Sequence, residues 1–208
     1  MSKQESSSIT GSSTRRYPRQ VDCGGAQLEV SPLRTADREA LAALVATLPP
    51  HDLLFLRRDI RHPKVLDAWM RAIEAGELAS LAARTEDGTL VGCTAIFSDP
   101  LSWSRHVGEL RVLASPDWRG RGLGRVLIQE CFAQALALEL TRLVAQMTTD
   151  QRAAIAVFED LGFKAEALLA GHVIDRQGRP HDLVLLAHDV RAVAARNVLY
   201  GMSEALGG

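Results

Sequence analysis

Hydrophobic and polar positions follow two different periods along most of the chain. Apolar residues at every second position are typical of strands with one buried face, and those at every third and fourth position are typical of helices. The first pattern predicts strands over 26–33, 78–85, 90–97, 108–114, 143–147, 163–173 and 182–188. The second predicts helices over 35–48, 151–160 and 191–203, a long helix that follows the segment 119–124 and runs to about residue 140, and two short helices within 51–76 that are separated at Pro63.

The order of these elements predicts an α/β fold in which a mixed sheet carries helices on its faces. We expect one folded domain over 26–190, followed by a C-terminal helix and tail over 191–208. Residues 1–25 are rich in serine at their start and poor in core residues, which predicts a disordered N-terminal arm.

Charge and composition exclude several classes of protein. The 208 residues carry 24 Lys and Arg against 25 Asp and Glu, a net charge of −1, whereas proteins that coat nucleic acid or anionic membranes need a basic excess. No apolar run approaches the roughly 18 residues of a membrane span, and the N-terminus has no apolar signal segment. Three scattered cysteines form no disulfide pattern. We therefore predict a cytoplasmic protein with no nucleic-acid or membrane partner.

Metal binding is not indicated by the linear sequence. The six histidines are not spaced as pairs of metal ligands with a nearby carboxylate, so we predict no metal.

The strongest chemical signal is the glycine-rich segment Arg119-Gly120-Arg121-Gly122-Leu123-Gly124-Arg125, which joins a predicted strand to a predicted helix. Glycines let a ligand approach the backbone, and a helix start offers free N–H groups to phosphate oxygens. The segment lacks the third glycine of a dinucleotide-binding fingerprint and the Gly-Lys-Ser/Thr of a P-loop. A tight turn that binds nothing is the alternative.

The segment resembles the signature R/Q-x-x-G-x-G/A of the GNAT acyltransferase superfamily, with Arg119, Gly122 and Gly124 in the signature positions. Two neighbouring stretches extend the similarity: Leu113–Gly120 resembles the strand-to-loop consensus, and Phe158–Phe163 resembles the element Y-x-x-L-G-F. The order of elements is similar over residues 26–190.

The resemblance implies a GNAT-like, mostly antiparallel sheet of about seven strands with one splayed parallel pair, and an N-acetyltransferase that uses acetyl-CoA as donor. It implies cofactor contacts from the strand that precedes the glycines, from the glycine segment and from the later helix. These contacts are Arg111, Val112, Leu113, Arg119, Gly120, Arg121, Gly122, Leu123, Gly124, Arg125, Gln151 and Phe158.

Glu109 is the candidate catalytic base, because an alkylammonium must lose a proton before it attacks and several superfamily members carry a glutamate at about this place. A carboxylate on the solvent face of a strand is the alternative. The superfamily often places a tyrosine acid where this chain has Phe158. The missing hydroxyl keeps a second function open, a non-catalytic acyl-CoA sensor.

The resemblance implies that the acceptor is a small molecule, an amino acid or a protein amine. It also implies that three segments select the acceptor: the residues after the first helix, the loop before the glycine-bearing strand and the last hairpin. The candidates there are Arg57, Arg58, Trp103, His106 and His172. Arg57 and Arg58 suit a substrate carboxylate, and a solvated helix face is the alternative. Superfamily members are often dimers, so we also expect a homodimer.

Overall fold

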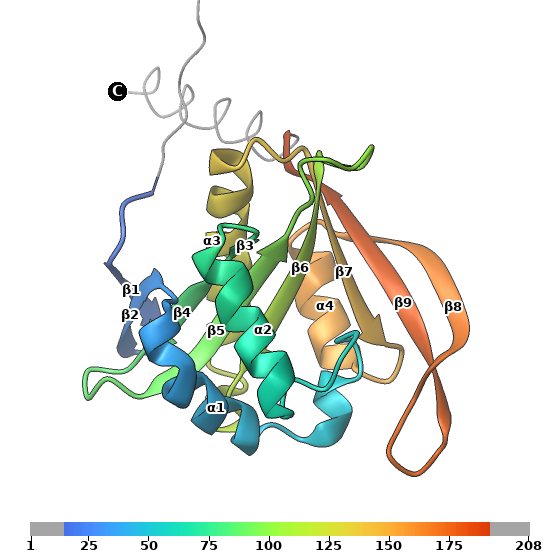
Figure 1. Cartoon of the computed structure of the whole chain (residues 1–208), viewed down its shortest axis with the longest axis horizontal. Helices are drawn as coiled ribbons and strands as arrows, with labels where there is room; N and C mark the ends of the chain where they lie inside the picture. Colours follow the sequence, from blue (N-terminus) through green and yellow to red (C-terminus); the bar gives the residue numbers. More distant parts are fainter. Residues whose placement is uncertain (1–14, 192–208) are drawn as a thin grey trace, which may run out of the picture.

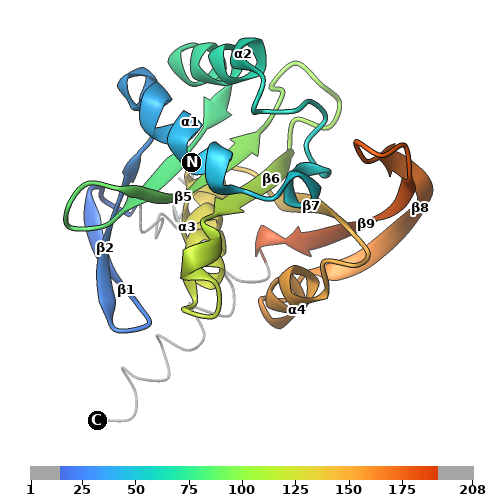
Figure 2. The same cartoon turned by 90° about the horizontal axis from the view of Figure 1, so that it is seen from below.

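The computed structural model describes residues 15–191 as a three-layer arrangement of helices and one sheet (Figure 1). Helices α1 (Arg38–Thr47) and α2 (Pro63–Glu74) cover one face of the sheet. Helices α3 (Leu123–Ala137) and α4 (Arg152–Asp160) cover the other, as Figure 2 shows. This arrangement confirms the predicted α/β fold.

The described part of the chain contributes nine strands to the sheet. In chain order they are β1 (Arg19–Cys23), β2 (Ala26–Pro32), β3 (Leu78–Ala79), β4 (Leu81–Arg84), β5 (Leu90–Phe97), β6 (Val107–Ala114), β7 (Arg142–Thr148), β8 (Lys164–Ile174) and β9 (Pro180–Asp189). Their order across the sheet is β1-β2-β4-β5-β6-β7-β9-β8, with β3 paired to β5. The count exceeds the expected seven because β1 was not predicted and the segment 78–85 forms two strands.

Strands β6 and β7 form the one parallel pair among the described strands, and they separate after three residue pairs. The register runs from Val107 with Arg142 to Glu109 with Val144 and then stops. Beyond Glu109, β6 remains paired to β5 on its other side, up to Ala114 with Gly92. The predicted splayed parallel pair is therefore present, and Glu109 lies at its vertex.

Strand β6 is held in place by packing on both of its faces. Leu110 packs in a buried cluster with Ile128 of α3, whereas Leu113 packs in a different cluster with Leu41 of α1. Because successive side chains of a strand point to opposite faces, Glu109 and Arg111 lie on the same face as Leu113, which is the face covered by α1 and α2.

The N-terminal segment corrects the predicted arm. Strand β1 pairs antiparallel with β2, and its alternating residues Val21 and Cys23 are buried. The two strands are joined by Gly24 and Gly25, whose φ angles of +61° and +84° match the tight hairpin turn that favours glycine. The expectation of disorder is thus wrong over residues 15–25. Residues 1–14 lie outside the described part of the chain.

The segment before β1 is tied to α3 through one buried carboxylate. The Glu130 residue is only 2% exposed. It accepts hydrogen bonds from Tyr17 at 2.8 Å and Arg15 at 2.6 Å, and it forms an ion pair with Arg19 at 3.1 Å. Burial, followed by the hydrogen bond to Glu130, raises the pKa of Tyr17 above its usual range. The phenol is therefore a neutral donor at physiological pH.

Other predictions hold only in part. Residues 51–76 form a short 3-10 helix, η2 (Pro50–Leu53), then turns, and then α2, so Arg57 and Arg58 lie on an irregular segment rather than on a helix face. The predicted helix over 191–203 lies almost entirely beyond residue 191 and is outside the described residues. None of the described helices has the length and apolar character that a membrane crossing requires.

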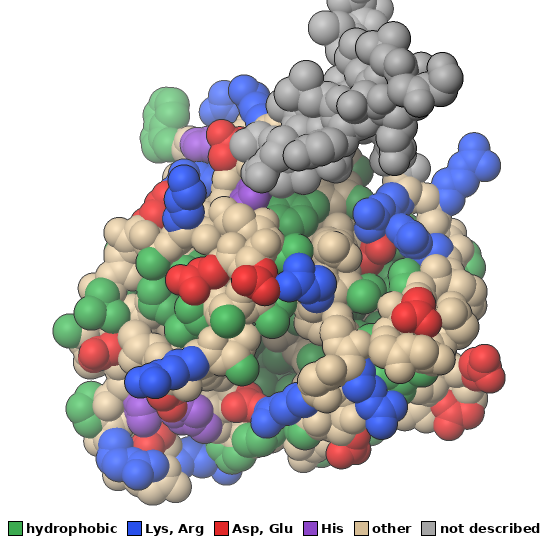
Figure 3. Space-filling model, turned by 180° about the vertical axis from the view of Figure 1, so that it is seen from behind, with side chains coloured by type: hydrophobic (Ala, Val, Ile, Leu, Met, Phe, Trp, Pro, Cys, Tyr) green, Lys and Arg blue, Asp and Glu red, His purple; other side chains and the backbone are tan. Residues whose placement is uncertain are grey.

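The surface over α3 and α4 carries no extended area of one charge. Figure 3 shows that acidic and basic side chains are interspersed on this face. The pattern agrees with the near balance of charges in the whole sequence.

Replacement of Glu130 tests whether its bonds to Arg15, Tyr17 and Arg19 stabilise the fold. We expect Glu130→Gln to lower the free energy of unfolding by about 2 kcal/mol, because one neutral amide cannot satisfy two guanidinium groups and a phenol at a buried position. For a domain of this size the loss corresponds to a fall in melting temperature of about 6 °C, measurable by calorimetry. Glu159→Gln, at an exposed position on α4, is the control. Equal melting temperatures for the two variants would show that the bonds of Glu130 do not stabilise the fold.

Candidate active site

The glycine-rich segment presents its backbone to open space. Gly122 has a φ of +87° and precedes α3, a conformation that side-chain-bearing residues rarely adopt. A Cβ atom added at Gly120, Gly122 or Gly124 would meet nothing within 4 Å. The first helical hydrogen bond here runs from the Val126 N–H to the Gly122 oxygen, so the amides before Val126 are donors that the helix leaves free. This open turn fits a phosphate-bearing ligand.

Three arginines surround the turn. Arg119 forms an ion pair with Asp52 of η2, and Arg125 forms one with Asp160 at 2.9 Å. The guanidinium of Arg121 lies 5.1 Å from the centre of the Trp118 ring. All three side chains remain accessible to solvent, so they add positive charge beside the free amides.

The turn between β1 and β2 packs against the glycine segment at Arg121. The Cys23 thiol donates a hydrogen bond to the Arg121 oxygen at 3.2 Å. A Cβ atom at Gly24 would come within 3.1 Å of Arg121, so only glycine allows this approach without displacement. The Gly24-Gly25 pair after alternating residues was the sequence signal for this contact.

Glu109 lies at the vertex of the splayed strands, beneath the connection between α1 and α2. Its side chain is 17% exposed and forms ion pairs with Arg111 at 2.8 Å and Arg57 at 3.2 Å. The Arg111 guanidinium also lies 4.2 Å from the centre of the Phe97 ring. Glu109 therefore belongs to a partly buried polar cluster rather than to an open strand face.

Several predicted cofactor contacts are core residues. Leu113 is 3% exposed, and Phe158 is 7% exposed and packs edge-on against Phe163 with the ring centres 4.9 Å apart. Val112 is partly buried against two core clusters. Their side chains serve packing, and the backbone oxygen of Phe158 already accepts hydrogen bonds from the Leu161 and Phe163 N–H groups. Gln151 precedes α4, is partly exposed and makes no side-chain capping bond.

A pocket of about 550 Å³ lies between residues 49–61 and the hairpin of β8 and β9. Of the predicted acceptor residues, Arg57 and Arg58 line it. Trp103, which is 95% exposed, His106 and His172 do not. The hairpin supplies Arg176 and Arg179, which the sequence analysis did not single out.

Carboxylates hold the pocket arginines in place. Asp59 bonds Arg61 at 2.9 Å and Arg176 at 3.0 Å, and the hydrogen bond from Arg61 is the main reason that its pKa is well below the usual range. The pKa of Asp175 is also well below its usual range, first because of its hydrogen bond with His181 and then because of Arg179 and backbone N–H groups. Both carboxylates are therefore ionised at neutral pH.

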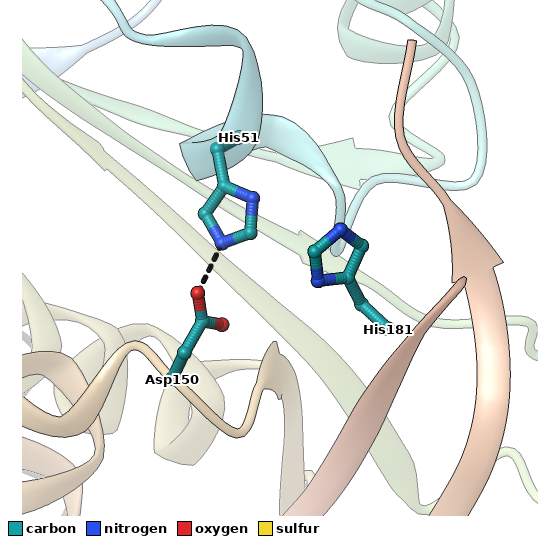
Figure 4. A group of neighbouring side chains, drawn as sticks. All are labelled: His51, Asp150 and His181. Carbon is teal, nitrogen blue, oxygen red and sulfur yellow. Dashed lines mark ion pairs between the residues drawn. The ribbon is translucent and has the colours of Figure 1, made fainter. Parts of the chain in front are cut away.

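Two histidines and an aspartate meet beside this pocket (Figure 4). His51 Nε2 lies 2.7 Å from an Asp150 oxygen and 3.4 Å from the Thr148 hydroxyl, and the rings of His51 and His181 are 5.0 Å apart. One donor atom from each of His51, Asp150 and His181 lies within 4.8 Å of the others, a spacing that could hold a metal ion. Linear spacing could not reveal this group because each member comes from a different element.

The cysteines offer no reactive thiolate in this region. Cys23, Cys93 and Cys131 are free and buried. Burial raises the pKa of Cys93 and Cys131 to about 12, so both stay protonated at physiological pH.

Comparison with solved structures finds the same fold in N-acetyltransferases. A phosphinothricin acetyltransferase from Sinorhizobium meliloti, in complex with acetyl-CoA, is 19% identical with a TM-score of 0.67, covering 78% of this chain and 88% of its own. A ribosomal-protein-alanine N-acetyltransferase from Brucella melitensis is 24% identical with a TM-score of 0.68, covering 77% and 98%. A spermidine N-acetyltransferase from Vibrio cholerae, with CoA and spermine, is 16% identical with a TM-score of 0.66, covering 79% and 96%.

A search of curated protein sequences finds no match. The family model described as the acetyltransferase (GNAT) family matches residues 48–163, which is more than half of the 208 residues and includes the glycine segment, Glu109 and α4. The chain therefore belongs to the acetyltransferase (GNAT) family, whose members are acyl-transferring enzymes.

Proposed function

We propose that this protein transfers an acetyl group from acetyl-CoA to the nitrogen of a primary amine. The observation that carries the proposal is the open glycine turn at the start of α3, placed beside the gap between β6 and β7. Neighbours of the same fold contain acetyl-CoA or CoA, which supports the choice of donor.

The donor would be held by two parts of the chain. The free amides of residues 122–124 and the guanidinium groups of Arg119, Arg121 and Arg125 suit the pyrophosphate. Beyond Glu109, the β6 edge that faces β7 has no strand partner among the described residues, so its backbone groups can pair with the amide-containing arm of CoA. When bound, acetyl-CoA supplies an activated acetyl carbon. The residues of this chain orient the donor and handle protons.

Glu109 is our proposed base because it lies where the two strands separate and where the reactive end of the arm would come. His51 is the other nearby candidate, since it lines the pocket and is oriented by Asp150. No hydroxyl is available at Phe158 to protonate the leaving sulfur. The thiol can leave as thiolate, because its pKa near 8.5 makes it a fair leaving group.

The acceptor would occupy the pocket between residues 49–61 and the β8–β9 hairpin. The structural neighbours are named for acceptors as different as spermidine and a ribosomal protein, so the fold alone selects no acceptor. We also retain the proposals of a cytoplasmic location and of a homodimer. The free state of all three cysteines supports a reducing compartment.

The decisive experiment measures release of CoA thiol from acetyl-CoA in the presence of polyamines, amino acids and peptides, together with mass spectrometry of the acceptor. We expect turnover with at least one amine and an acetyl group on its nitrogen. Binding of acetyl-CoA without turnover on any acceptor would contradict the proposal and favour an acyl-CoA sensor.

A second prediction concerns the glycine turn. We expect Gly122→Asp to abolish the rise in melting temperature that acetyl-CoA causes, because a side chain and a negative charge would meet the pyrophosphate. Gly88→Asp is the matched control, since Gly88 also has a left-handed φ, +84°, with open space at its Cβ position. Stabilisation by acetyl-CoA that survives in Gly122→Asp would place the donor elsewhere.

A third prediction separates the two candidate bases. We expect Glu109→Gln to lower kcat by about 100-fold or more, a usual effect of losing a general base, while the affinity for acetyl-CoA is retained. His51→Gln is the comparison, and steady-state kinetics over pH 6–9 is the measurement. A large loss of kcat in His51→Gln, with near-normal rates in Glu109→Gln, would transfer the role of base to His51.

A further inference from the structure

The acceptor pocket carries an excess of positive charge. Its lining includes the arginines at positions 57, 58, 61, 176 and 179 and the aspartates at positions 59 and 175. When the adjoining Glu109 and Arg111 are included, together with Asp150, which pairs with the lining residue His51, six guanidinium groups face four carboxylates, a surplus of two positive charges. Asp59 and Asp175 are ionised at neutral pH, so the count treats each of them as one negative charge.

Three of these guanidinium groups have N–H donors that remain available to a ligand. No ion pair joins Arg58 to another residue in the described part of the chain. Arg57, with a side chain 75% exposed, shares Glu109 with Arg111, and Arg176, 62% exposed, shares Asp59 with Arg61. A guanidinium has five N–H donors, so one shared carboxylate oxygen leaves most of them available. The pocket is thus suited to a ligand oxyanion.

The same pocket has an apolar wall. Leu53, Leu54 and Leu56 contribute from one side, and Val173 and Ile174 contribute from the hairpin. Ile174 is 66% exposed, so its apolar surface is accessible to a ligand in the pocket. A ligand that fits must therefore carry apolar surface as well as negative charge.

Arg57 lies both in the positively charged pocket and beside the proposed base, since its Nη2 atom donates a hydrogen bond to Glu109 Oε2 at 3.2 Å. A ligand carboxylate bound by Arg57 would lie next to Glu109. In an α-amino acid the amine is one carbon away from the carboxylate, so the amine would come close to the same glutamate. Amines with a distant carboxylate would not have this placement.

We propose that the acceptor is a free α-amino acid with an apolar side chain, whose carboxylate is bound by Arg57 and Arg58 and whose side chain contacts the apolar wall. This assignment rests on the proposed N-acetyl transfer. In the reaction the amine enters unprotonated, its ammonium proton having gone to solvent. Its nitrogen forms a C–N bond at the acetyl carbon and gives one proton to Glu109, while the C–S bond breaks and the sulfur leaves as thiolate with the bonding electron pair. Polyamines are disfavoured because their charges have the same sign as the pocket surplus.

The test compares L-leucine with L-leucinamide, which has the same amine and side chain but no carboxylate, and with spermidine. We expect kcat/KM, expressed per concentration of unprotonated amine, to be at least tenfold higher for leucine. The preference should shrink as ionic strength rises, because the binding is charge-dependent. Arg58→Ala should raise KM for leucine about tenfold, leave kcat near its original value and leave leucinamide unaffected. Arg71→Ala, at an exposed position on α2, is the control.

A binding measurement keeps the acceptor inference separate from catalysis. We expect N-acetyl-L-leucine to bind the CoA complex in titration calorimetry, with the affinity reduced at least tenfold in Arg58→Ala and unchanged in Arg71→Ala. No acetyl transfer to any amine would refute the proposed function. Two results would overturn the acceptor inference alone. One is equal or faster transfer to leucinamide or spermidine, and the other is an affinity for N-acetyl-L-leucine that is unchanged in Arg58→Ala.

Discussion

The early end of the parallel ladder between β6 and β7 is the constraint on which the rest of this site depends. Three residue pairs hold the strands together, and after Glu109 and Val144 the backbone of β6 no longer bonds to β7. Unpaired backbone groups inside a protein are costly unless a partner satisfies them. The gap therefore suits the extended, amide-bearing arm of the donor that we propose, and Glu109 lies at the point where the ladder ends.

Packing on both faces fixes β6 beside the gap. Leu110 and Leu113 anchor β6 in clusters on opposite faces of the sheet. The short helix η2 then crosses the open end, because Asp52 pairs with Arg119 beyond β6 and His51 pairs with Asp150 beyond β7. Residues of η2 also line the acceptor pocket. The glycine turn, the strand gap and the pocket that we propose for the acceptor are thus all connected through η2.

The sequence predicts the features that are local along the chain and misses those that only folding brings together. The glycine segment and the strand that leads to Glu109 are contiguous, so motif and periodicity locate them. Strand β1 was missed because a serine-rich start hid the alternation of Val21 and Cys23 around a Gly-Gly turn. The group of His51, Asp150 and His181 has no linear signature, because a 3-10 helix, a loop and a strand supply one residue each.

Net charge does not reveal the local sites of this protein, because its basic groups act locally. All but three of the 24 basic residues are arginine. A planar guanidinium can bond one carboxylate and still present N–H groups to a second anion, which a compact ammonium does less well. Arg119 beside the glycine turn and Arg57 beside Glu109 are both in that situation. A net charge of −1 is therefore compatible with the two separate anion sites that we propose, one for a phosphate-bearing donor and the other for an anionic acceptor.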